Sequence, residues 1–137
     1  MLVDIFVIDG MGGGLGKAAI EHILQAGISC NIVAVGTNAA ATAAMLKAGA
    51  HNCATGENAV KYNAKNADVI IGPLGVVFAD SMFGEISPKM AKAIVKSNAY
   101  KILIPVSKCN ATVLGSGDKT LGEHFNEMVS ILKSMNI

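Results

Sequence analysis

Tryptophan is absent from this sequence, and phenylalanine and tyrosine bring the aromatic share of its 137 residues to only 4%. Charged residues are also sparse, at 15%, and the two signs nearly cancel to a net charge of +1. A nearly neutral chain has no electrostatic footprint for nucleic acid or an anionic membrane, so we expect neither partner. The core has to be built from aliphatic and methionine side chains, which suits helices layered on a sheet.

Cysteines and long apolar runs are scarce as well. Cys30, Cys53 and Cys109 are widely spaced and form no C-x-x-C pair, which favours reduced thiols in the cytoplasm over a disulfide framework. The longest apolar run, residues 69–79, contains Pro73 and is too short to span a bilayer. We therefore predict a cytoplasmic protein with no membrane segment, and the length predicts one domain, residues 1–137.

Glycine, in contrast, is concentrated in one segment, residues 10–16. An apolar run rich in β-branched residues precedes it at 5–8, which predicts a buried parallel strand. From Leu15 the apolar period changes, because Leu15, Ala19 and Ile23 share one helical face. The glycines therefore lie where a strand turns into a helix.

Such a junction is suited to binding an anion. Backbone amides at a helix N-terminus point toward the ligand, and glycine lets a phosphate approach without a Cβ in the way. Gly10, Gly14 and Gly16 form G-x-x-x-G-x-G, the spacing of the short-chain dehydrogenase branch of dinucleotide-binding folds. We predict a small phosphate-containing ligand here, a nucleotide or dinucleotide, with a purely structural tight turn as the alternative.

Two commoner phosphate motifs fit less well. The pattern G-x-G-x-x-G requires a glycine where Leu15 stands. The P-loop pattern fails at two positions. This chain has Met11 where the pattern requires its first glycine, and Ala18 where it requires the hydroxyl residue that binds magnesium. A P-loop triphosphate site is therefore disfavoured.

Apolar runs and amphipathic patterns alternate along the rest of the chain. We expect helices over 39–48 and 57–66 and from residues 88 and 121, and strands over 31–35, 51–54, 68–71 and 101–106. Ser87 before Pro88 is typical of a helix start. We expect that helix to bury Met90, Ala91, Ile94 and Val95. Residues 111–114 suit a short edge strand, and 76–83 suit either helix or loop.

This alternation predicts an α/β fold, a doubly wound and mostly parallel sheet in a three-layer Rossmann-like sandwich. Such sheets bind ligands beyond the carboxyl ends of their strands, where the strand order reverses. The candidate binding residues there are Gly10, Met11, Gly12, Gly13, Gly14, Leu15, Gly16, Gly36, Thr37, Asn38, Gly72, Pro73, Leu74 and Gly75.

The second predicted strand departs from the dinucleotide pattern. It often ends in an acidic residue that binds the adenosine ribose, but here Gly36, Thr37 and Asn38 offer only neutral groups. Thr37 and Asn38 can bond a ribose or cap the following helix. No arginine stands nearby to favour a 2′-phosphate, so the cofactor is unknown, with NAD, NADP and other nucleotides as candidates.

Candidate catalytic groups are few. Asp80, Ser81 and Glu85 follow the fourth strand and offer acid–base or metal-ligating oxygens, or belong to a solvated loop. Asp9 suits a hydrogen-bond acceptor that fixes the glycine loop. Cys109 is either a nucleophile or a structural thiol.

The histidines and remaining cysteines do not predict a metal site. His51 and Cys53 share one face of a strand, but a zinc site needs two more ligands at closed spacing. His22 and His124 lie on predicted helices, far from that pair in the sequence, and we expect both on the surface.

Five segments give the chain a resemblance over nearly its whole length: VIDGMGGGLGK, AVGTNAAATAAMLKAGA, ATGENAV, ADVIIGPLG and KILIPV. Through them it resembles a family of short bacterial proteins of unknown function, which implies a Rossmann-like domain and no particular activity. The first strand–helix–strand unit also resembles short-chain dehydrogenases. Their catalytic Y-x-x-x-K is absent, because Asn66 follows Tyr62 and Ile104 follows Tyr100 at that spacing.

Two functions fit these observations. In the first, the protein is a nucleotide-binding enzyme or subunit, with 10–16 holding phosphate and 72–75 bordering the reactive end. Its small size would then require a second subunit to roof the crevice. In the second, it is a non-catalytic sensor or assembly subunit whose glycine loop is structural. Seven methionines, several on predicted helices, suit a homodimer or ordinary core packing.

Overall fold

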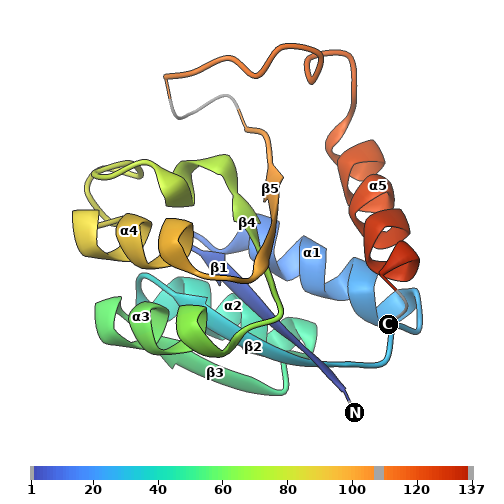
Figure 1. Cartoon of the computed structure of the whole chain (residues 1–137), viewed down its shortest axis with the longest axis horizontal. Helices are drawn as coiled ribbons and strands as arrows, with labels where there is room; N and C mark the ends of the chain where they lie inside the picture. Colours follow the sequence, from blue (N-terminus) through green and yellow to red (C-terminus); the bar gives the residue numbers. More distant parts are fainter. Residues whose placement is uncertain (1, 107–109, 136–137) are drawn as a thin grey trace.

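The computed structural model describes residues 2–106 and 110–135 of the chain. Its five strands form one parallel sheet in the order β3-β2-β1-β4-β5 (Figure 1). The strands are β1 (Val3–Asp9), β2 (Cys30–Gly36), β3 (Asn52–Thr55), β4 (Val69–Pro73) and β5 (Tyr100–Ile104). The helices are α1 (Gly14–Gln25), α2 (Ala39–Ala48), α3 (Glu57–Asn66), the 3₁₀ helix η1 (Leu74–Val77), α4 (Pro88–Lys96) and α5 (Leu121–Ser134). The strand order reverses between β1 and β4, which confirms the predicted Rossmann-like fold.

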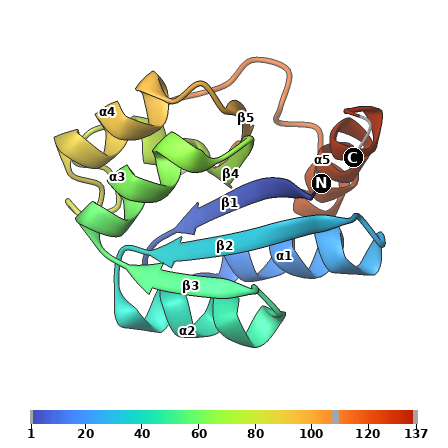
Figure 2. The ribbon, with the colours of Figure 1, turned by 60° about the horizontal axis from the view of Figure 1, so that its bottom comes forward.

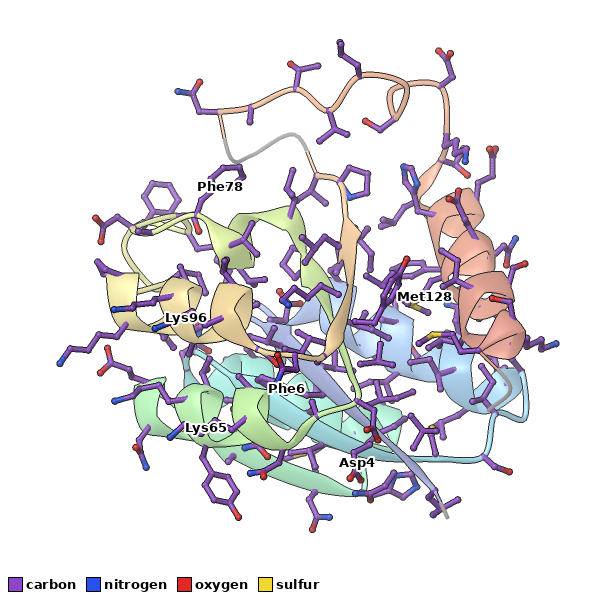
Figure 3. The ribbon with its side chains drawn as sticks, in the orientation of Figure 1. Asp4, Phe6, Lys65, Phe78, Lys96 and Met128 are labelled. Atoms are coloured by element: carbon purple, nitrogen blue, oxygen red, sulfur yellow. The ribbon has the colours of Figure 1, made fainter. Side chains whose placement is uncertain are left out.

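Helices cover both faces of the sheet (Figure 2). α1, α2 and α5 lie on one face, and α3, α4 and η1 lie on the other. Because side chains alternate along a strand, β1 directs Ile5 and Val7 toward the α1 face and Phe6 toward the α4 face. Figure 3 labels Phe6 of β1 and Met128 of α5, one from each of the two hydrophobic cores.

Side-chain caps explain where α2 and α4 begin. Asn38 is the N-cap of α2, and its side-chain oxygen accepts a bond from the Ala41 amide at 2.9 Å. Ser87 caps α4, accepting from the Met90 amide at 3.2 Å, with Pro88 as the first helical residue. The predicted ranges of α2 and α3 are confirmed.

Three sequence predictions were wrong. Val95 is 56% exposed, because α4 packs on the sheet through Met90, Ala91 and Ile94 instead. Residues 111–114 form no strand, since they belong to an exposed segment that arches over the carboxyl edge rather than lying beside β5 (Figure 1). His22 and His124 are both half-buried rather than on the surface, and the His22 ring stacks on Phe125 of α5 at 4.7 Å.

The undecided segment 76–83 is the end of η1 followed by a loop. None of the helices in the described ranges is both long and apolar enough to cross a membrane.

Candidate functional site

A cleft of about 1580 Å³ opens at the carboxyl edge of the sheet, and we call it the carboxyl-edge cleft. One wall is the glycine loop after β1, and another is the arch, residues 110–120. The arch leads into α5 (Figure 1). Phe78, labelled in Figure 3, lines the cleft from the end of η1. The other lining residues are 9–15, Pro73, 79–83, Pro105, Val106, 110–113, Ser116, Gly117, Lys119, Leu121 and His124.

The structure divides the predicted binding residues into two groups. The first group lines the cleft and consists of Gly10, Met11, Gly12, Gly13, Gly14, Leu15 and Pro73. The second group lies outside its lining and consists of Gly16, Gly36, Thr37, Asn38, Gly72, Leu74 and Gly75. Seven of the fourteen predicted residues therefore share this one cleft.

Several of the glycines are explained by packing alone. A Cβ added to Gly36 would lie 2.5 Å from the Thr42 amide nitrogen, and one added to Gly72 would lie 2.6 Å from the Ile8 carbonyl oxygen. Gly13 has a left-handed φ of 74°, and its Cβ would lie 2.7 Å from Ala41 Cα. No side chain fits at these positions without a shift of the backbone.

Gly12 and Gly14 differ from these glycines. Both are exposed, and a Cβ built on either would meet nothing within 4 Å. Neither has the left-handed backbone that favours glycine. Neither packing nor conformation explains why these two cleft-lining positions lack a side chain.

Asp9 fixes the glycine loop from beneath, as predicted. Its carboxylate is buried and accepts bonds from the Gly10 amide at 2.8 Å and the Gly16 amide at 2.7 Å. Burial raises the pKa of Asp9, and the bonds from the loop amides work in the opposite direction. A protein carboxylate thus already interacts with the amides of Gly16 and Leu15 in the first turn of α1.

Glu85 holds the loop from above. One carboxylate oxygen accepts from the Met11 amide at 2.7 Å and from the Thr37 hydroxyl at 2.5 Å. The Asn38 amide group lies 3.3 Å from both carboxylate oxygens. The bond from the Met11 amide, followed by that from Thr37, lowers the pKa of Glu85. The sequence marked Glu85 as a candidate oxygen donor but gave no indication that it joins the ends of β1 and β2.

Glu85 belongs to the 78–87 loop, which has an unusual backbone. Asp80, Met82 and Phe83 have left-handed φ values of 67°, 57° and 57°, and Gly84 follows at 88°. Such conformations are costly for residues with a side chain and persist only where surrounding bonds impose them. Here the Asp80 amide donates to the Ile86 carbonyl at 2.7 Å, which closes the loop on itself.

The other candidate groups are dispersed. Asp80, Lys119 and His124 line the cleft, and Lys119 also pairs with Glu127 of α5. Ser81 donates to the Gly75 carbonyl at 2.5 Å. In residues 2–106 and 110–135, no three histidine, cysteine or acidic side chains gather as they would to hold a metal.

The Cys53 thiol is not activated for reaction. Burial raises the pKa of Cys53, which disfavours its reactive thiolate. Cys109, the candidate nucleophile, lies outside the described residues.

Comparison with known sequences agrees with one of the two resemblances. The sequence profile of the domain of unknown function DUF3842 matches residues 4–136, and the chain therefore belongs to this family. No curated protein matches it. The predicted resemblance to a family of unknown function is confirmed, whereas the resemblance to short-chain dehydrogenases is not.

Proposed function

For this family member we propose the binding of a small phosphate-containing ligand, such as a nucleotide, at residues 12–15 of the carboxyl-edge cleft. The observation that carries the proposal is the pair Gly12 and Gly14. Nothing in the protein fills the space where their side chains would be. A phosphate approaching the backbone requires that space, and glycine provides it.

The hydrogen bonds of the loop support the same location. Asp9 and Glu85 accept from the amides of Gly10, Met11 and Gly16. Within the described ranges, the amides on Gly12 and Gly14 donate to no protein group. Gly14 is the first residue of the 12-residue helix α1, whose dipole favours an anion at this end.

The far side of the cleft suits an anion as well. Lys119 and His124 line it from the arch and the first turn of α5. A cationic side chain on the opposite wall adds a charge-assisted hydrogen bond to a phosphate already held by backbone amides. The apolar lining from Phe78 and Val113 provides a surface for the uncharged part of the ligand.

The two loop carboxylates favour a second candidate function. The buried Asp9 already occupies the first turn of α1, so the loop is structurally complete without a ligand. In that case the protein is a sensor or assembly subunit, and we expect its sedimentation mass to be that of a homodimer.

Ligand screening followed by calorimetry separates the two functions. Thermal shift against NAD, NADP, ATP, nicotinamide mononucleotide and inorganic phosphate comes first. A ligand at about a hundred times its Kd adds about 2.7 kcal/mol of stability, which raises the melting temperature by several degrees. Unchanged melting curves across the panel contradict phosphate binding and favour the assembly function.

For a ligand that binds, Gly14→Val is expected to abolish binding while leaving the fold intact. The valine enters open space at the first position of α1, where it blocks the ligand rather than the protein. Gly122→Val is the matched control, because Gly122 lies in the first turn of α5 outside the cleft and its Cβ meets nothing closer than 3.9 Å. Retained affinity in Gly14→Val rules out the phosphate cradle.

A further inference from the structure

The space above Gly10 is filled by side chains from two other loops. A Cβ on Gly10 would lie 2.7 Å from Thr37 Oγ1, 2.8 Å from Glu85 Oε1 and 2.8 Å from Met82 Sδ. Thr37 follows β2, and the other two residues belong to the 78–87 loop. Protein side chains therefore fill the space between the end of β2 and the glycine loop.

This closed place is the one that an adenosine ribose takes in a dinucleotide-binding fold. There, the ribose lies between the glycine loop and the end of the second strand, where an acidic residue accepts its hydroxyl bond. In this chain, the end of β2 is neutral, and the acidic residue comes from the loop after η1 instead.

The hydrogen bonds of Glu85 show which role this acid takes. Its Oε1 already accepts from the Met11 amide and the Thr37 hydroxyl, and the Asn38 amide group faces both oxygens. The carboxylate thus receives the donors that would otherwise face a ligand hydroxyl. Thr37 and Asn38 are absent from the lining of the cleft, as expected if Glu85 and Met82 cover them.

We infer that Glu85 seals the adenosine side of the site, so that the cleft accepts a mononucleotide and gains nothing from the adenosine half of a dinucleotide. This inference rests on the proposed phosphate binding at residues 12–15. The adenosine half is excluded by the position of the cleft and not by its volume. The cleft, of about 1580 Å³, lies over the ends of β1, β4 and β5 and not over the end of β2. The uncharged part of the ligand then lies toward Pro73 and Pro105.

The seal is tested without any ligand by amide hydrogen exchange. Glu85→Ala removes the acceptor of the Met11 amide, so we expect Met11 to exchange about tenfold faster or more. Glu57→Ala is the matched control, because Glu57 accepts from Ser87 at the other end of the same loop and does not contact Met11. Unchanged exchange at Met11 in Glu85→Ala overturns the seal.

The ligand class is tested by calorimetry with nicotinamide mononucleotide and NAD. In the natural protein we expect NAD to bind no more tightly than the mononucleotide. Opening the seal in Glu85→Ala should raise the affinity for NAD about tenfold relative to the affinity for the mononucleotide, because a closed subsite lowers apparent affinity by the fraction of molecules in which it is open. Glu85→Gln keeps an oxygen acceptor but no charge. Its affinity for NAD should lie between those of the natural protein and Glu85→Ala.

The outcomes distinguish the seal from the proposed function. If NAD binds the natural protein much more tightly than the mononucleotide and Glu85→Ala loses that advantage, Glu85 is a ribose acceptor and the seal is wrong. If neither nucleotide nor phosphate binds any variant, the proposed function fails and the ligand assignment fails with it. The exchange rate at Met11 still decides whether Glu85 closes the end of β2.

Discussion

The carboxyl edge of the sheet has two halves, one at the end of β2 and one at the ends of β4 and β5. Similar segments build both halves, but protein side chains fill the first and leave the second open as a cleft. At the β2 half, Gly36 and Asn38 are packed and hydrogen-bonded, and Glu85 reaches over from another loop. At the β4 and β5 half, the glycine loop faces a cleft whose far wall is the arch. Both halves follow parallel strands and precede helix N-termini, so general topology predicts a ligand at either one.

What differs is whether the protein satisfies its own donors. In the β2 half, a carboxylate accepts from the Met11 amide and the Thr37 hydroxyl. In the open half, Gly12 and Gly14 have neither a packing partner nor a protein acceptor within the described part of the chain. A glycine-rich loop is thus not one functional unit, because its glycines serve packing at some positions and access at others.

Replacing one glycine in each half should produce the largest contrast. Gly36→Ala places a Cβ 2.5 Å from a backbone nitrogen of Thr42, and we expect it to lower the free energy of unfolding by about 3 kcal/mol. Gly12→Ala enters open space and should change it by less than about 0.5 kcal/mol. Urea unfolding measures both. Equal losses in the two variants would remove the distinction between closed and open halves.

A comparison of two helix caps tests how tightly the closed half is tied together. Asn38 caps α2 and also donates to the Met11 carbonyl at 2.9 Å. The Thr120 side chain caps α5 by accepting from the Glu123 amide, and within the described residues it has no bond to the glycine loop. We expect Asn38→Ala to cost about 2 kcal/mol of unfolding free energy and Thr120→Ala about 1 kcal/mol. Similar values for both caps would show that the bond to the glycine loop adds no stability.

The pH dependence of stability should show the smallest effect, because Glu85 is partly exposed. Its pKa is lowered in the fold by the Met11 amide and the Thr37 hydroxyl, so its ionised form stabilises the protein above the unfolded pKa near 4.5. That contribution is lost as the pH falls through the lowered folded value. We expect the urea midpoint to fall more steeply in acid for the natural protein than for Glu85→Gln.

The control for this experiment is Glu57→Gln, which removes a carboxylate bonded to Ser87 outside the closed half. It should follow the natural protein through the acid range. Parallel curves for Glu85→Gln and the natural protein would mean that Glu85 is not held by the loop in solution.

Local patterns predicted the elements well where one face of a helix met the core. Residues 39–48 and 57–66 became α2 and α3 over the predicted ranges, because the Asn38 cap of α2 and the spacing of Val60 and Ala64 in α3 act within one helix. Val95 was misassigned because the width of the buried stripe depends on how far α4 tilts onto the sheet. Local sequence patterns likewise could not predict that residues 111–114 are exposed, since their position depends on where α5 packs.

The sequence by itself determined the order of strands and helices, the parallel sheet and the position of the glycine loop at its carboxyl edge. These follow from apolar periodicity, caps and right-handed crossovers, which are encoded over short stretches. Only the tertiary structure decided which half of that edge is closed. Glu85 is 74 residues from Met11 and 48 from Thr37, and a contact across that separation depends on the packing of the whole sheet rather than on any local pattern.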